Sequence, residues 1–247
     1  MKKYLLIYLL LVFSNFVFGK NAAFDQGVEH LSKKEFIEAK KSFLIAIEER
    51  PDFSAYYNLG IANGKLEDWR AARWAFEASL KYRPSSTKAR YNARFATVKI
   101  DSNLEWEHPY SWVERLILAI HGYIWLILTI VSTMLIGAFV YNYVAKTKNT
   151  VLNKWLKRFL VPTAILFAIS FFSLIYQRSL LVEPHFAIIK NKELKSYISP
   201  NGIEIDYELN PKVRLEIIDS FEDDLWLYVK SDDKTAIWVR SSDLYWF

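Results

Sequence analysis

Two long runs of apolar residues stand out in the pattern of hydrophobic and polar positions. Residues 116–145 and 159–177 contain no Asp, Glu, Lys or Arg. A helix that crosses a bilayer needs about 20 mostly apolar residues, so each run is long enough to span. Two buried core helices are the alternative, but core helices of this length usually carry a polar stripe. We therefore predict a membrane hairpin, with helices over 111–145 and 159–182.

Local signals mark where these two helices begin. Ser111 and Glu114 have the spacing of a capping box, which predicts the start of the first spanning helix. Pro162 falls near the predicted start of the second helix, where its missing N–H costs little.

The segment between the two runs, 146–158, is predicted to be a short cytoplasmic loop. Short loops rich in Lys and Arg stay in the cytoplasm. This one carries five basic and no acidic residues, namely Lys146, Lys148, Lys154, Lys157 and Arg158. Both ends of the chain are then expected on the outer side of a bacterial cytoplasmic (inner) membrane, in a two-pass topology with the N-terminal and C-terminal domains periplasmic.

The N-terminus has the form of an export signal over 1–19. Two lysines precede the apolar stretch 4–13, and Val17 and Gly19 are small enough for the −3 and −1 positions of a cleavage site. An uncleaved signal anchor is the alternative. Either form sends the following residues across the membrane, which agrees with the charge of the loop.

Residues 20–103 contain an internal repeat. Small residues, an aromatic residue and a proline recur at a spacing of about 33 residues, in the pairs Gly27 and Gly60, Ala39 and Ala72, Phe43 and Phe76, Ala46 and Ser79, and Pro51 and Pro84. This order suits two antiparallel helices that pack closely and end at the proline. The segment resembles tetratricopeptide repeats, with units at 20–52 and 53–86, a capping helix at 87–100 and a linker at 104–110.

The tetratricopeptide resemblance implies a peptide-binding groove along the first helix of each unit. Residue-by-residue placement puts eight candidate side chains there: Phe24, Tyr57, Asn58, Ile61, Lys88, Tyr91, Asn92 and Phe95. Asn58 and Lys88 match positions that bind a peptide carboxylate in some family members. Phe24 and Val28 stand where those members have the Lys and Asn that complete the carboxylate clamp, so the clamp is incomplete here. We expect an aromatic groove for an apolar peptide; the alternative is that part of the set is core.

The C-terminal segment, 183–247, changes to alternating short strands. Strands are predicted at 186–189, 212–218, 225–230 and 235–240, with turns at 201–202 and 231–234. The segment resembles a bacterial SH3-like barrel. Three aromatic residues, Trp226, Tyr245 and Trp246, are candidates for a binding face, and the alternative for Trp226 is a core position.

Composition narrows the chemistry. The chain has 247 residues and no cysteine, which excludes disulfides, thiolate nucleophiles and cysteine-based metal sites. The net charge of +5 is concentrated at the N-terminus and in the short loop, so it does not indicate nucleic-acid binding. No catalytic, cofactor or metal-binding constellation is predicted. The expected fold class is a multidomain membrane protein: an all-α repeat domain, a two-helix transmembrane hairpin and an all-β SH3-like barrel.

The whole order of signal, repeats, two spans and SH3-like domain resembles the BatE-like proteins of the Bacteroides aerotolerance (Bat) operon. That resemblance implies a non-enzymatic membrane scaffold for envelope stress. Its implied partners are other Bat-type membrane proteins with von Willebrand A-type domains and, indirectly, a MoxR-type ATPase. The alternative is a peptidoglycan anchor that recruits a secreted enzyme.

Overall fold

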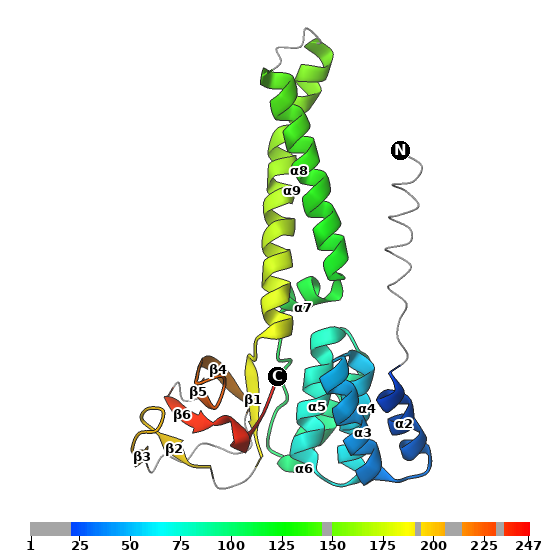
Figure 1. Cartoon of the computed structure of the whole chain (residues 1–247), viewed down its shortest axis with the longest axis vertical. Coiled ribbons are helices and arrows are strands. Elements are labelled where there is room, and N and C mark those ends of the chain that lie inside the picture. Colours follow the sequence, from blue (N-terminus) through cyan, green and yellow to red (C-terminus); the bar gives the residue numbers. More distant parts are fainter. Residues whose placement is uncertain (1–20, 145–149, 191–193, 206–213, 231–234) are drawn as a thin grey trace.

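The computed structural model describes residues 21–144, 150–190, 194–205, 214–230 and 235–247, so the predicted signal at 1–19 lies outside the described residues. Figure 1 shows a group of short helices and a strand domain side by side at one end of a long helical hairpin. The predicted order of helical domain, two helices of membrane length and antiparallel strand domain is confirmed. That the two end domains are tetratricopeptide and SH3-like remains a prediction.

The helical domain consists of two helical hairpins and a fifth helix. Its elements are α2 (Ala22–Ser32), α3 (Phe36–Glu49), α4 (Phe53–Lys65), α5 (Trp69–Tyr82) and α6 (Thr87–Ile100). Side-chain oxygens accept hydrogen bonds from first-turn amides at the starts of four of them, from the N-cap residues Asn21, Asp52, Asp68 and Ser86. The prolines Pro51 and Pro84 follow the ends of α3 and α5.

The repeated glycines lie where the two helices of a pair approach most closely. A Cβ added to Gly27 would lie 2.6 Å from the ring of Phe43, and one added to Gly60 would lie 2.6 Å from the ring of Phe76. Both rings are buried, so neither can move aside cheaply. The sequence prediction that small residues allow this approach, with the phenylalanine behind, is confirmed.

We expect Gly60→Ala to lower the free energy of unfolding by about 1–3 kcal/mol, because the new methyl group overpacks the contact with Phe76. The measurement is the thermal unfolding midpoint of the purified full-length protein, followed by circular dichroism. Gly137→Ala in the spanning helix is the matched control, since a Cβ there meets nothing within 4 Å. Equal midpoints for the two variants would contradict the close-approach argument.

The hairpin differs from the sequence prediction in three places. The predicted helix at 111–145 is broken into α7 (Trp112–Ala119) and α8 (Gly122–Val144). The second helix, α9 (Thr150–Val182), begins inside the segment predicted as loop. Pro162 therefore lies well inside α9 rather than near its start. The capping box at Ser111 and Glu114 is confirmed, but it begins the short α7.

Most of the apolar side chains of the two long helices are exposed on the surface of the protein. The windows Gly122–Asn142 and Arg158–Val182 have mean hydropathies of 2.2 and 2.1, and only 11% of each is buried within the protein. Helices of a soluble core would be mostly buried, so this exposure favours contact with lipid. Where α8 and α9 touch, small polar residues meet: Thr129 Oγ1 donates to Ser170 Oγ at 3.0 Å.

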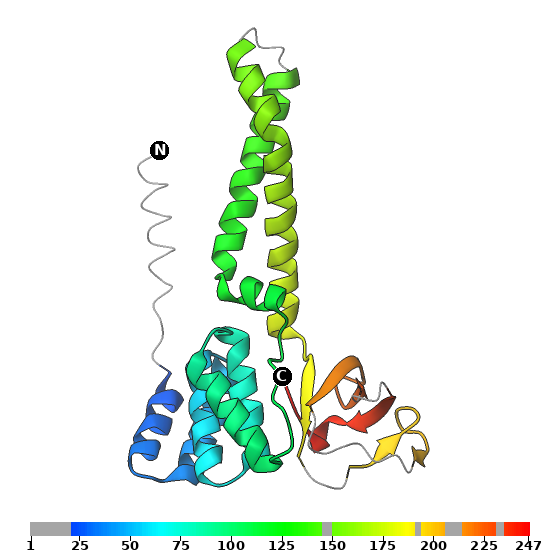
Figure 2. The ribbon, with the colours of Figure 1, turned by 180° about the vertical axis from the view of Figure 1, so that it is seen from behind.

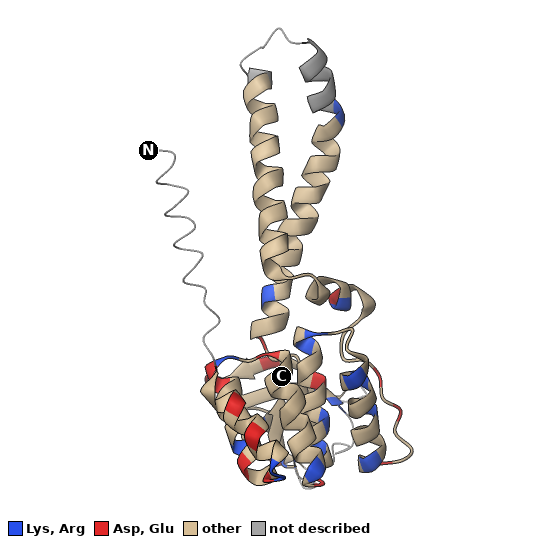
Figure 3. Ribbon diagram, turned by 90° about the vertical axis from the view of Figure 1, so that its right-hand side faces the viewer, with Lys and Arg blue, Asp and Glu red and all other residues tan. Residues whose placement is uncertain are grey.

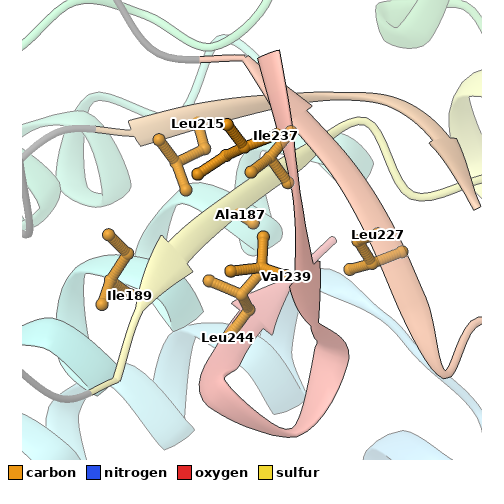
Figure 4. Close-up of a cluster of buried hydrophobic side chains, with 8 residues drawn as sticks. Ala187, Ile189, Leu215, Leu227, Ile237, Val239 and Leu244 are labelled. Atoms are coloured by element: carbon orange, nitrogen blue, oxygen red, sulfur yellow. The ribbon is translucent and has the colours of Figure 1, made fainter. Parts of the chain in front are cut away.

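The strand domain is a seven-stranded antiparallel sheet with the order β3-β2-β6-β5-β4-β1-β7. Its strands are β1 (Phe186–Ile189), β2 (Ser196–Tyr197), β3 (Glu204–Ile205), β4 (Arg214–Phe221), β5 (Trp226–Lys230), β6 (Ala236–Arg240) and β7 (Leu244–Trp246). Inward-facing aliphatic side chains form one core (Figure 4), made by Ala187, Ile189, Leu215, Leu227, Val229, Ile237, Val239 and Leu244.

The predicted strands are found, although three others were missed. β1 has the predicted bounds, and β4, β5 and β6 agree within three residues wherever their predicted bounds are described. The predicted turn at Asn201 is present, with φ of 56°. The predicted turn at 231–234 lies outside the described residues. The missed strands β2, β3 and β7 have two or three residues each, too few to show alternation.

Candidate functional site

Two of the predicted groove residues of α4 and α6, Tyr57 and Asn92, come together in the structure. Asn92 Nδ2 donates to the Tyr57 hydroxyl at 3.2 Å, which joins the two helices. The Tyr57 ring stacks on Phe53 at 5.5 Å, and half-buried Ile61 packs against the core between α5 and α6. Asn58, the other predicted residue of α4, is half-buried.

Phe24 takes another place in the repeat domain. Its ring packs against Phe43 at 5.8 Å, within the core of the first two helices. Phe24 is therefore a core residue and not a groove residue. This agrees with the alternative prediction that part of the set belongs to the core.

The outward side of α6 carries the exposed members of the predicted set. Tyr91 is 67% exposed and Phe95 is 44% exposed, and Lys88 is exposed one turn before them. The three share one face, because residues three and four apart are neighbours on a helix. We call this set, with the two neighbours described next, the α6 surface.

Trp69 and Lys99 complete the α6 surface, and sequence reasoning missed both. The Trp69 ring meets Phe95 edge to face at 5.7 Å. Lys99 Nζ lies 5.5 Å from the Phe95 ring centre and 5.7 Å from that of Trp69. The spacing of Lys99 four residues after Phe95 was a usable signal, whereas Trp69 comes from the start of α5 and needed the fold.

The charge of α6 is uniformly positive. The helix contains Lys88, Arg90, Arg94 and Lys99 and no acidic residue. In Figure 3, α6 carries Lys and Arg positions only, while the acidic positions gather on helices at the far side of the domain. An apolar ligand that also bears acidic groups would therefore meet a complementary surface.

A second site is buried where α5, the segment 104–110 and β4 meet. Glu77 of α5 has no exposed surface. Its carboxylate accepts from Arg73 Nε at 2.9 Å, from Arg214 of β4 at 3.2 Å and from the Trp106 indole at 2.8 Å. We call this cluster the Glu77 joint. Burial by itself raises the pKa of Glu77, but the two guanidinium groups outweigh it, and its pKa is lowered.

The segment 104–110 takes part in the joint. The Trp106 ring also packs against the core of α5 and α6, and Tyr110, only 2% exposed, meets the Phe186 ring of β1 at 5.8 Å. Arg214 donates to the backbone carbonyl of Glu107 at 3.1 Å. The predicted linker is thus packed between the helical and strand domains (Figure 2).

The three aromatic residues predicted for the strand domain lie in different surroundings. Trp226 is 4% exposed and packs edge to face on Tyr197 at 4.9 Å. Tyr245 stacks on Trp74 of α5 at 5.1 Å, and the Trp74 indole donates to the backbone carbonyl of Trp246 at 3.0 Å. β5 and β7 are separated in the sheet order by β4 and β1. Only the Trp246 side chain is markedly exposed, at 39%.

A cavity of about 460 Å³ lies where the repeat domain meets the foot of the hairpin. Its lining combines residues from the start of α4, the end of α5 and the loops beside them with residues at the α7–α8 turn: Asp52, Phe53, Ser54, Tyr82, Arg83, Pro84, Ser85, Ala119 and His121. Within the described residues, no three His, Asp or Glu side chains gather in a way that could hold a metal ion.

The comparisons with known proteins add no family: no protein-family model, no curated protein and no solved structure matches the chain. The geometry itself defines a class. It is a hairpin of two helices of membrane-spanning length that carries a helical domain and an antiparallel strand domain packed together at one end.

Removing the charge at the Glu77 joint should destabilise the protein. We expect Glu77→Gln to cost about 3 kcal/mol, because the guanidinium groups of buried Arg73 and partly buried Arg214 lose the counter-charge of Glu77. Thermal unfolding of the full-length protein measures this. Glu29→Gln is the control, since Glu29 pairs with Lys33 at an exposed position and should change little.

The wild type and Glu77→Gln also allow a test of pH dependence. The pKa of Glu77 is lowered from its ordinary value of 4.5, so its contribution to stability is present above that value and is lost as the pH falls through the lowered pKa. The wild type should therefore lose more stability than Glu77→Gln on acidification below about pH 4.5. Parallel acid profiles would contradict a charged Glu77.

Lys81 should give a pH response of the same sign as Glu77, but in the alkaline range, because the pKa of each group is lowered in the folded protein. Its ammonium donates to the backbone carbonyl of Glu183 at 3.3 Å, and burial lowers its pKa to about 8 from 10.5. Between these values the unfolded chain binds the extra proton, so stability rises with pH. Lys81→Met should flatten the rise in the unfolding midpoint between pH 8 and pH 10.5. An unchanged slope would show that Lys81 is not the group responsible.

Proposed function

We propose that this protein is a non-enzymatic membrane scaffold that binds protein partners through the α6 surface. The observation that carries the proposal is the exposure of Tyr91 and Phe95 on a helix whose opposite face is buried. Rigid aromatic side chains with cationic neighbours are typical of residues that anchor protein partners. The uniform positive charge of α6 favours a partner segment that combines apolar and acidic groups.

The repeat domain is proposed to be of the tetratricopeptide class and the strand domain to be SH3-like. Two successive helical hairpins with the same glycine–phenylalanine contact support the first assignment. A small antiparallel sheet around a single aliphatic core supports the second. Both assignments rest on resemblance and geometry together.

The proposed setting is a Bat-type envelope complex in a bacterial cytoplasmic membrane. Both domains lie at the same end of the hairpin (Figure 1), so both would face the same compartment. The basic segment between the spans favours placing that compartment outside the cytoplasm. The proposed partners are other Bat-type membrane proteins, and any link to a MoxR-type ATPase would run through one of them, because the segment between the spans is short.

The packing of the strand domain favours the scaffold over a peptidoglycan anchor. The Trp226 ring is buried and the Tyr245 ring stacks on Trp74, so little of this aromatic set is free to hold sugar or peptide from the cell wall. The specific contacts between the strand and helical domains, at Glu77 with Arg214 and at Trp74 with Tyr245, instead suit a rigid body that presents the α6 surface in one orientation.

Site-specific photo-crosslinking in the native membrane tests the scaffold proposal. We expect a photoreactive phenylalanine at Tyr91 or Phe95 to crosslink one discrete membrane protein with a von Willebrand A-type domain, identified by mass spectrometry. Ile45 on α3 is the control, since it is 50% exposed but lies away from α6. The double variant Tyr91→Ala, Phe95→Ala should abolish co-purification of that partner without changing the unfolding midpoint.

Two results would contradict the proposal. Crosslinks as strong from Ile45 as from Tyr91 and Phe95 would show that the α6 surface is not selective. Strong retention of the double variant on purified cell-wall sacculi, with no protein crosslink from α6, would favour the peptidoglycan anchor instead.

A further inference from the structure

The chain turns sharply between the repeat domain and the first long helix. α7 ends at Ala119, Ile120 is extended with φ of −91° and ψ of 124°, and α8 begins at Gly122. Figures 1 and 2 show α7 lying across the foot of the hairpin rather than in line with α8. An apolar sequence without a proline at this point would ordinarily continue as one helix, so the turn needs a structural cause.

That cause is a set of hydrogen bonds from the spanning helices. Gln177 Nε2 of α9 donates to the carbonyl of Ile117 at 2.9 Å and to that of Ile120 at 2.7 Å. The Trp125 indole of α8 donates to Ile117 as well, at 3.3 Å. The last carbonyls of a helix have no partner inside it, so these donors stabilise the end of α7. The glycine at position 122 provides space for the Gln177 side chain, because a Cβ there would lie 3.0 Å from Gln177 Oε1.

Hydrogen bonds near both ends of α7 show that the whole helix lies at one level along α9. Near its start, the Glu114 carboxylate accepts from the Tyr176 hydroxyl at 2.8 Å, and at its end the carbonyls meet Gln177. Glu114 and Ala119, the last residue of α7, are separated by about 7.5 Å along α7, whereas Tyr176 and Gln177 differ by about 1.5 Å along α9. α7 therefore lies roughly perpendicular to the spanning helix.

This depth coincides with the end of the uncharged run 159–177, five residues before the membrane-length window of α9 ends at Val182. Gln177 precedes Arg178, which is exposed and is the first charged residue after the long apolar stretch of α9. In α8, the apolar window begins at Gly122, directly after the turn. If α8 and α9 cross a bilayer, α7 lies at the boundary between acyl chains and headgroups.

α7 also has two different faces. Trp112, Val113 and Leu116 are 71%, 40% and 55% exposed. On the other side, Leu118 is 6% exposed and packs with Leu80 of the repeat domain and Leu180 of α9. The exposed face has no protein neighbour within the described residues that would account for its apolar character.

We propose that α7 is an in-plane interfacial helix whose Trp112–Val113–Leu116 face inserts into the phospholipid leaflet on the side of the repeat domain. The proposal rests on the membrane placement in the proposed function. Its occupant is lipid because the face is continuous with the two spans and lies at their boundary, where tryptophan is favoured. Helices of this kind bury their apolar face about 5–10 Å into the boundary region.

The consequence is a fixed orientation for the repeat domain. Leu118 links the back of α7 to Leu80 of α5, so lipid contact on one face of α7 and protein contact on the other clamp the domain to the membrane surface. The α6 surface would then be presented at a constant height and angle to neighbouring membrane proteins.

Spin labels on single cysteines test the insertion, and the natural absence of cysteine makes each label unique. The full-length protein is reconstituted in phosphatidylcholine–phosphatidylglycerol vesicles with Leu116→Cys or Val113→Cys. Accessibility to oxygen and to a water-soluble nickel chelate is then measured by power saturation. Val98→Cys on α6 and Ile130→Cys in α8 are matched controls, with exposures of 45% and 44%.

We expect the oxygen-to-nickel ratio at positions 116 and 113 to lie several-fold above that at 98 and below that at 130. A ratio at 116 and 113 equal to that at 98 places α7 in water and overturns the proposal. Low accessibility to both reagents marks a protein contact, with a partner or a second copy, and overturns it too. Failure of the membrane placement itself is distinguishable, because position 130 would then also behave as water-exposed.

Discussion

The buried carboxylate of Glu77 is the constraint on which the arrangement of the whole protein depends. A charge without solvent is tolerated only when donors surround it. Here they come from α5 itself, from Trp106 in the connecting segment and from Arg214, which lies 137 residues away in sequence. Because the group is satisfied only when all three segments are docked, the helical and strand domains form one body rather than two units on a flexible tether.

The short helix α7 relates that body to the hairpin in a similar way. Gln177 is the only amide side chain in the apolar part of α9, and both of its donor bonds go to carbonyls at the end of α7. The Gln177 side chain is buried, and a buried amide without hydrogen-bond partners would be costly. Its use as a helix cap gives it partners and sets the angle at which the chain enters the hairpin, without any disulfide in the chain.

Local packing could be predicted from the sequence, and long-range polar contacts could not. The repeated glycine and phenylalanine pairs identified the close helix contacts because both partners recur at one spacing. Tyr91 and Phe95 were found by matching positions, but Trp69 reaches them only through the fold. The turn before Gly122 was missed because the run around it is mostly apolar, although His121 and Gly122 were local signals for a break. Glu77 looked like any charged helix residue, because its partner Arg214 comes from another domain.

The position of Trp106 has a consequence for how such a chain could evolve. Its ring packs against the core between α5 and α6, at the end of the helical array. In a longer array, α6 would be the first helix of a third pair, and the second helix of that pair would follow it here. Duplication of a repeat at that end would separate the tryptophan from Glu77 and open the contact with the strand domain. The strand domain, which contributes no repeat of its own, thereby opposes a further repeat after α6.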